Sequence, residues 1–197
     1  MRSTKSRIAA ITALAATALA VGIVAGSGHD SPKTAEAAES GQTAKAIPSY
    51  SAALTRAQSD QEQAVQSRTP ATDTRLVIAA GPEDVYVGRI PNKDAVCISV
   101  EQRATQYLST TCGDAAAATS GRLFLIRSGT ESNGYLVVGV TPTNSVSATV
   151  TGDRESTAGE ARGGLFVVRL NEQPRSLTFD SADGSTVARL EVPRTAK

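Results

Sequence analysis

Tryptophan is absent from this sequence, and histidine and methionine each occur once among its 197 residues. Aromatic residues make up only 4% of the chain, although hydrophobic residues make up 40%. We therefore expect a core filled by small and β-branched side chains, which pack well on the pleated surface of a sheet. The length fits one medium-sized domain with additional segments.

Several patterns that carry chemistry are also missing. The single histidine, His29, lies in a segment rich in Ser, Ala and Gly, where it is a poor general base or metal ligand. The sequence contains no G-x-S-x-G nucleophile elbow, and no glycine-rich loop is followed by the Lys-Ser or Lys-Thr pair of a phosphate cradle. We predict no catalytic residues and no cofactor.

The charges are nearly balanced, with 20 basic and 19 acidic residues. Basic and acidic side chains are interspersed, whereas nucleic-acid binding requires a clustered basic face, so we expect no nucleic-acid partner. Asp153, Glu155 and Glu160 are candidate calcium ligands, but Arg154 and Arg162 are interspersed with them and the D-x-D-x-D-G spacing is absent, which favours a solvated loop. Asp180 and Asp183 fit turn propensity better than acid–base catalysis.

The N-terminus has the pattern of an export signal. A basic cap is followed by uncharged, mostly apolar residues 8–25. Two interpretations remain open: residues 1–26 are a cleaved signal peptide, or they stay as a membrane anchor near the lower length limit for a span. Either one predicts that the rest of the chain is extracytoplasmic, secreted or held at the membrane by residues 8–25.

Two segments separate this leader from the main domain. Residues 27–48 have the composition of a flexible linker. Residues 49–69 contain apolar positions at helical spacing, ended by Thr69-Pro70, and predict one amphipathic helix over 49–68. Its apolar stripe is narrow and rich in alanine, so the helix either rests weakly on the domain or binds a partner.

Residues 73–193 contain short runs of Val, Ile, Leu, Phe and Thr bounded by Gly, Pro, Asn or Asp. The expected strands are 75–79, 84–90, 95–102, 105–112, 122–128, 135–140, 145–151, 164–170, 176–181 and 185–192. An Asp-Gly pair at 183–184 predicts a hairpin between the last two. The fold class is therefore all-β, an antiparallel β-sandwich of two layered sheets, Ig-like in broad architecture. Residues 194–197 form a tail.

Individual runs give more detailed expectations. In the strand over 145–151 we expect Val146, Ala148 and Val150 to face inward, because apolar and polar residues alternate there. The polar, glycine-bearing residues 152–163 predict a loop. The strand over 164–170 is apolar on both faces, which predicts central burial.

The two cysteines lie on the arms of a predicted hairpin. In an exported chain a lone pair of cysteines is expected to be bonded, and hairpin arms bring Cα atoms within the range of roughly 4.4–6.8 Å that a disulfide needs. We predict a structural bond between Cys97 and Cys112. A redox-active role would require closer spacing such as C-x-x-C.

The order of these features resembles a diffuse group of uncharacterised exported or membrane-tethered proteins of high-GC Gram-positive bacteria. The resemblance rests on the helix at 54–60, on Val96-Cys97-Ile98 with Cys112, on the segments 135–142 and 146–150, and on Asp183-Gly184. The turn after Pro142 departs from the pattern of the group. The resemblance implies export and a similar fold, and it implies no activity.

Three functional hypotheses follow. The leading one is a non-enzymatic interaction or structural module at the cell envelope, which binds a partner by strand pairing at an open edge, 102–111 or 185–192. The second is a small cell-envelope hydrolase or a glycan-binding accessory domain. The third is a membrane-tethered regulator that binds a partner through the helix at 49–68.

Overall fold

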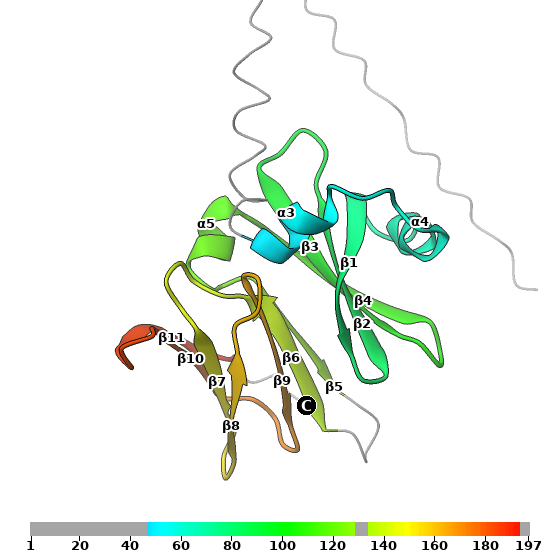
Figure 1. Cartoon of the computed structure of the whole chain (residues 1–197). Coiled ribbons are helices and arrows are strands. Elements are labelled where there is room, and N and C mark those ends of the chain that lie inside the picture. The colour runs from blue at the N-terminus through cyan, green and yellow to red at the C-terminus, as the bar shows by residue number, and fades with distance from the viewer. Residues whose placement is uncertain (1–46, 129–133, 194–197) are drawn as a thin grey trace, which may run out of the picture. The chain divides into compact units, whose positions relative to one another are not determined.

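The computed structural model of the chain describes residues 47–128 and 134–193 (Figure 1). The described residues are predominantly antiparallel β-structure, which confirms the fold class at that level. Their strands divide into three sheets, whereas the sequence predicts two layers. The predicted leader at 1–26, most of the linker at 27–48 and the tail at 194–197 lie outside the described residues.

The first sheet is a meander in which each strand pairs with the next along the chain. Its strands are β1 (Thr72–Ala80), β2 (Glu83–Arg89), β3 (Ala95–Gln102) and β4 (Tyr107–Asp114). The predicted hairpin with the two cysteines is β3–β4, and it is in register over its whole length. Short polar turns join the strands, as expected from their composition.

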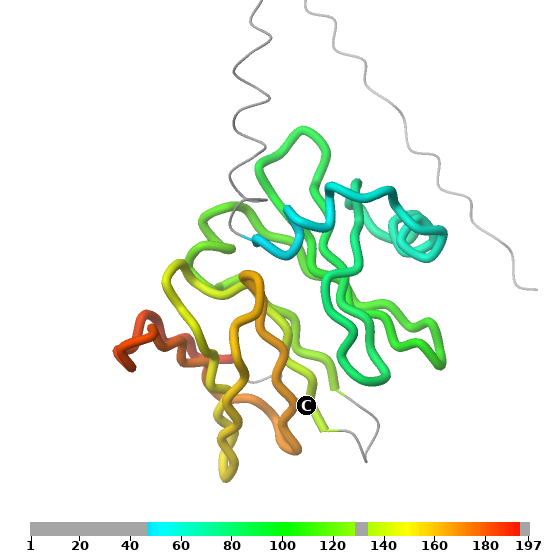
Figure 2. Tube along the Cα trace, in the orientation of Figure 1, coloured from blue at the N-terminus to red at the C-terminus, as the bar shows by residue number. Residues whose placement is uncertain are grey.

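The other two sheets share the second half of the chain. The middle sheet has the order β5-β6-β9, and the third sheet has the order β11-β10-β7-β8. Their strands are β5 (Phe124–Ser128), β6 (Tyr135–Val140), β7 (Ser147–Thr151), β8 (Ser156–Glu160), β9 (Leu165–Leu170), β10 (Ser176–Asp180) and β11 (Thr186–Glu191). The predicted Asp-Gly hairpin joins β10 to β11, which projects at the red end of the trace in Figure 2.

Two hydrophobic cores lie on opposite faces of the middle sheet. The first core faces the first sheet and contains Ile47, Tyr50, Val85, Val87, Val96, Ile98, Val100, Ala118, Leu123, Leu125, Leu136, Val138, Val140 and Leu165. The second core faces the third sheet and contains Val137, Ala148, Val150, Phe166, Val168, Leu170, Leu177 and Phe179. Strand alternation explains this division, because successive side chains of β6 and β9 point to opposite faces. The predicted burial of β9 follows from its position between the two cores.

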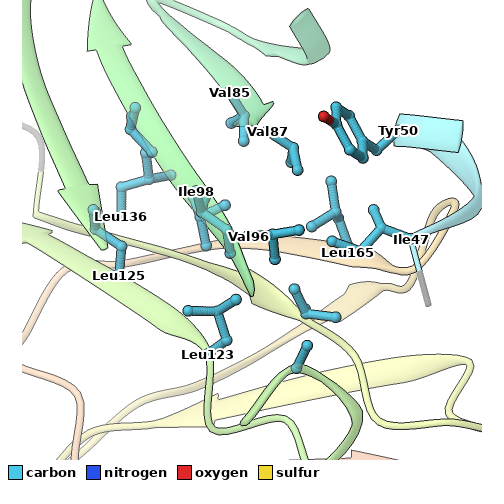
Figure 3. Packing of buried hydrophobic residues seen from close by; sticks show 14 residues of the cluster. Ile47, Tyr50, Val85, Val87, Val96, Ile98, Leu123, Leu125, Leu136 and Leu165 are labelled. Atoms are coloured by element: carbon cyan, nitrogen blue, oxygen red, sulfur yellow. The ribbon is translucent and has the colours of Figure 1, made fainter. Parts of the chain in front are cut away.

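The first core is closed at one end by the residues that precede β1. Ile47 and Tyr50 are fully buried there, beside Leu165, while Leu125 and Leu136 lie at the other end (Figure 3). The backbone N–H and the hydroxyl of Ser49 both donate to the carbonyl of Gly163, at 3.0 and 2.9 Å. Residues 47 and 48, assigned to the linker from the sequence, therefore belong to the folded domain.

The single helix predicted over 49–68 is wrong, because the structure has two short helices there. They are α3 (Pro48–Ala53) and α4 (Asp60–Gln66). Ser59 and Glu62 form a reciprocal capping box, which starts a new helix at Asp60 instead of continuing the first. A third helix, α5 (Ala115–Thr119), is capped by Asp114, so the segment after β4 contains one helical turn before the chain enters the middle sheet.

Two further expectations are corrected. The predicted loop at 152–163 contains strand β8, which pairs with β7 along its length. Its small and polar side chains hide the strand signal, because β8 is an edge strand that buries little. Val146 is 47% exposed rather than inward-facing, since β7 begins one residue after it. Ala148 and Val150 are buried as predicted.

None of the helices in the described part of the chain is long and apolar enough to cross a membrane. The apolar segment at 8–25, on which the predicted signal or anchor depends, is outside that part. The predictions of export and of membrane attachment therefore stay predictions.

Candidate functional site

A disulfide joins Cys97 of β3 to Cys112 of β4, as predicted from the sequence. The two residues face each other directly in the ladder, and their Cα atoms are 4.0 Å apart, slightly closer than the expected range. Cys97 is fully buried, whereas Cys112 is exposed. The bond covalently fixes β4, the last strand of the first sheet, to its only partner strand in that sheet.

No strand of the described residues pairs with the outer edge of β4. In an antiparallel ladder, residues alternate between hydrogen-bonded and non-bonded pairs. Ala115 N donates to Asp94 O at 3.2 Å, which makes that pair a bonded one and sets the phase of the ladder. The N–H and C=O groups of Leu108, Thr110 and Cys112 consequently point away from β3. The first predicted edge segment, 102–111, thus leads into a strand with an open edge.

β5 presents a second open edge at the end of the middle sheet. Val140 N donates to Leu123 O at 2.9 Å, so that pair is bonded and Leu125 and Arg127 continue the bonded series. The backbone groups of Ile126 and Ser128 point away from β6. The second predicted edge segment, 185–192, contains β11, which ends the third sheet.

A cleft of about 400 Å³ lies where the β3–β4 turn and the end of β5 approach each other. Its volume is within the range of roughly 300–1,000 Å³ that is usual for ligand pockets. It opens at one end of the first core, the end where Leu136 lies. The cleft is lined by Glu83, Gln102, Tyr107, Ser109, Ile126, Arg127, Ser128, Gly134, Leu136 and Arg169.

Two arginines bridge the sheets across this cleft, and their environments differ. Arg169 of β9 forms an ion pair with Glu83 of β2, whose side chain is 8% exposed, and donates to the carbonyl of Ala80 at 2.9 Å. Arg127 of β5 has no carboxylate partner among the described residues. Its Nη2 donates to Oε1 of Gln102 at 3.0 Å, and its guanidinium lies 5.1 Å from the ring centre of Tyr107.

Among the described residues, the side chains that line the cleft therefore leave one positive charge without a carboxylate partner. Nη1 of Arg127 is shielded from solvent and has no hydrogen-bond partner within the described residues. A buried donor without an acceptor is unfavourable, and structures usually satisfy such groups with protein, water or a ligand. Tyr107 is 60% exposed, which is unusual for an aromatic side chain in a protein with so few of them.

A second hollow lies beside α4, and its charges are already paired. It is lined by Gln61, Ala64, Ser67, Arg68, Glu101, Arg103 and Gln106. Arg68 forms an ion pair with Glu101, and Arg103 binds Asp84 with two hydrogen bonds of 2.8 and 2.6 Å. Burial, followed by the charges of Asp84 and Glu101, raises the pKa of Tyr86 beneath this hollow. These contacts hold the helix and the β3–β4 turn on the first sheet.

The carboxylates considered as calcium ligands from the sequence stabilise turns instead. Asp153 binds Arg175 through two hydrogen bonds of 2.9 and 2.7 Å. Glu155 accepts a hydrogen bond from the backbone N–H of Asn171 at 3.1 Å, and Glu160 pairs with Arg162. Within residues 47–128 and 134–193, no group of three or more His, Cys, Asp or Glu side chains is arranged to hold a metal ion.

The acidic pair in the last hairpin also has a local role. Asp183 accepts hydrogen bonds from Ser181 and from the backbone N–H of Ser185, and these bonds lower its pKa to about 2. Asp180 accepts a hydrogen bond from Thr186 at 3.1 Å. Both residues act within the β10–β11 turn, and His29 lies outside the described residues.

Comparisons with known proteins give no identification. No family model matches the sequence, and neither the curated proteins nor the solved structures contain a match. The interpretation of the cleft therefore depends on its own geometry and charge.

The residues of the cleft were not predicted from the sequence, although a signal for two of them was present. Two positions before Arg127 and Arg169 stand the apolar residues Leu125 and Val167, which pack in or against the first core. A charge at such a position needs a partner from the opposing sheet or from a ligand. For Arg169 the partner is Glu83, and for Arg127 the described residues offer an amide and an aromatic ring.

Proposed function

We propose that the protein is a non-enzymatic, extracytoplasmic interaction module that binds an extended segment of a partner by adding it as a strand to β4. The observation that carries this proposal is the pair of open strand edges, β4 and β5, that flank one polar cleft. Main-chain hydrogen bonds to an exposed edge supply affinity, and adjacent pockets select side chains.

The disulfide supports the same proposal. An edge strand that accepts a partner must keep its own register while its outer hydrogen bonds form and break. The Cys97–Cys112 bond holds β4 on β3 towards the end of the hairpin remote from its turn. A docking edge outside the cytoplasm would therefore be ordered before the partner arrives, which reduces the entropy lost on binding.

The location at the cell envelope is part of the proposal and rests on the sequence. The basic cap and apolar run of residues 1–25 would direct the chain across a membrane, and the run at 8–25 would tether the module there if it is not cleaved. We also propose that the first and middle sheets correspond to the two layers of an Ig-like sandwich in the broad sense, with the third sheet packed on the outer face.

The two other functional hypotheses receive less support. A regulator that binds its partner through the apolar side of the helical segment would have to expose Tyr50 and Val65, which are fully buried in the domain. A hydrolase would need a pair of convergent acids or an activated nucleophile. The cleft contains one carboxylate, Glu83, and Arg169 already neutralises it.

Proline substitutions at two edges test the proposed docking strand. Thr110→Pro removes an N–H that points away from β3, so it blocks strand addition without removing a ladder bond. Arg189→Pro is the matched control on β11: Val192 N bonds to Arg175 O, and the alternation from that pair places the N–H of Arg189 outside the β10–β11 ladder. Peptides selected from a random dodecapeptide library on the full chain serve as probes, and fluorescence anisotropy measures their dissociation constants.

We expect Thr110→Pro to abolish peptide binding and Arg189→Pro to leave it unchanged, with both variants retaining the β-sheet circular dichroism spectrum. If only Arg189→Pro lost binding, the docking edge would be β11 and not β4. Unchanged binding in both variants, or a library that yields no peptide bound by the wild-type chain, would overturn strand addition.

A further inference from the structure

We propose that the cleft between β4 and β5 recognises a carboxylate carried by the added peptide, and that Arg127 is the residue that anchors it. This inference rests on the proposed function, because the carboxylate arrives on a strand paired with β4. Two groups of a partner chain present a carboxylate: an Asp or Glu side chain, and the free C-terminus. Both fit this inference.

The first reason is the unused hydrogen-bonding capacity of Arg127. A guanidinium has five N–H donors and never loses its charge in proteins. Nη1 of Arg127 is shielded from solvent and finds no acceptor within the described residues, although Nη2 is bonded to Gln102. A carboxylate of the ligand would accept from the unused nitrogen and balance the charge in a single contact.

The second reason is that the guanidinium is held in position before a ligand binds. Oε1 of Gln102 accepts from Arg127 at 3.0 Å, and the hydroxyl of Thr105 donates to the same oxygen at 2.9 Å, which fixes the amide. The ring of Tyr107 lies against the guanidinium on another side. Little side-chain entropy is then lost when an anion binds, so the contact contributes more to affinity.

The third reason is the contrast with Arg169 in the same cleft. Glu83 neutralises Arg169, so its charge is not available to a ligand. The lining residues therefore carry one net positive charge, and it is located on Arg127. A single carboxylate matches this charge, and the planar fork of arginine suits the planar carboxylate group.

Strand geometry determines how the carboxylate would reach the cleft. Tyr107 and Ser109 are two residues apart on β4, and both line the cleft. A strand paired with β4 would direct every second side chain to the same face. An acidic residue on that face would enter the cleft beside Ser109 and meet Arg127 from β5.

A double-mutant cycle on the full chain tests the inference. The probes are the peptides selected for the edge-strand experiment, each compared with versions in which one Asp or Glu is changed to its amide or the free C-terminus is amidated. The protein variants are Arg127→Gln, Arg127→Lys and the control Arg122→Gln, which removes an equal charge from an exposed arginine just before β5. Fluorescence anisotropy gives the affinities, and the side-chain ¹⁵Nε–H resonance of Arg127 reports contact.

We expect neutralisation of one particular carboxylate to weaken binding roughly tenfold or more, as for other hydrogen bonds to charged groups. Arg127→Gln should weaken binding of the acidic peptide by the same factor. In that variant, neutralising the carboxylate should change the affinity very little, while Arg127→Lys should recover part of the affinity. Arg122→Gln should bind like wild type. The position of the sensitive carboxylate, internal or terminal, identifies its source.

Two outcomes would overturn the inference and leave the proposed function standing. One is equal affinity of acidic and amidated peptides for a wild-type chain that remains sensitive to Thr110→Pro. The other is an Arg127 resonance that responds more strongly to inorganic phosphate than to acetate at equal ionic strength. Loss of sensitivity to Thr110→Pro would count against the proposed function itself.

Discussion

The carboxylate of Glu62 on α4 accepts a hydrogen bond of 2.7 Å from the backbone N–H of Leu76 in β1, and the Glu62 side chain is only 1% exposed. The same carboxylate accepts from the backbone N–H of Ser59 at 2.7 Å and pairs with Arg56. One buried acid thus joins the start of a helix, the loop before it and the edge of the first sheet.

Replacing Glu62 should destabilise the domain strongly. Glu62→Ala leaves the Leu76 N–H without its acceptor, removes half of the capping box and frees Arg56, so we expect a loss of about 3 kcal/mol in the free energy of unfolding. Arg56→Ala should lose less, because Arg56 is 45% exposed and water replaces part of its contact. Urea denaturation measures both variants. Equal losses would show that the ion pair, and not the backbone bonds, carries the effect.

The same residue should make stability fall in acid. Burial alone would raise the pKa of Glu62, but the hydrogen bonds from Arg56, Ser59 and Leu76 outweigh it and lower the pKa from 4.5 to about 2. A carboxyl group whose pKa is lower in the folded state stabilises fully above about pH 4.5, and this contribution is lost as the pH falls towards 2. The difference in unfolding free energy between wild type and Glu62→Gln, measured from pH 6 to pH 2.5, should therefore shrink. A constant difference would contradict the assignment.

The disulfide should contribute measurably to stability. It closes a loop with a sequence separation of 15, for which chain entropy gives about 3 kcal/mol. The double variant Cys97→Ala, Cys112→Ala should lose about that amount in urea denaturation, and thiol titration of the denatured, unreduced wild-type protein should detect no reactive thiol. Two titratable thiols would show that the bond does not form in the protein.

A side chain at Gly139 should disturb the second core. Gly139 lies between Phe124 and Phe166 on the neighbouring strands, and an added Cβ would come within 2.5 Å of the Phe166 ring and 2.7 Å of Phe124 Cβ. We expect Gly139→Ala to lower the free energy of unfolding by about 2 kcal/mol, because the added methyl group overpacks the core.

The control for that variant is Gly184→Ala in the β10–β11 turn. An added Cβ at Gly184 meets nothing within 4 Å, but the backbone has φ +81°, so the expected loss is about 1 kcal/mol from conformation alone. Thermal denaturation of both variants makes the comparison. A smaller loss for Gly139→Ala than for Gly184→Ala would contradict the packing of the middle sheet.

Much of the fold could be predicted because its signals are local. Alternation of apolar and polar residues, together with turn dipeptides such as Asp183-Gly184, indicates antiparallel strands without reference to distant residues. The capping box at Ser59 and Glu62 is also local, and its recognition would have divided the predicted helix correctly. Strand β8 was not predictable in this way, because an edge strand of small polar residues has the composition of a loop.

The candidate site was less accessible to sequence reasoning. The open edges were expected in the right segments, but the cleft beside β4 depends on which sheet packs against which. Arg127 and Gln102 are 25 residues apart in sequence, and Arg169 and Glu83 are 86 apart. Neither separation reflects a local helix or strand repeat, so the sequence alone does not indicate that these residues are in contact.

The sequence by itself determined that this chain forms antiparallel strands and that one hairpin carries a cysteine on each arm, since both properties depend on neighbouring residues. Only the tertiary structure decided that the strands form three sheets with two cores, and that one arginine of the cleft is neutralised while the other finds no carboxylate among the described residues. The physical reason is that charge pairing between sheets depends on the face and the register at which they pack, and many sequences with the same alternation allow different choices.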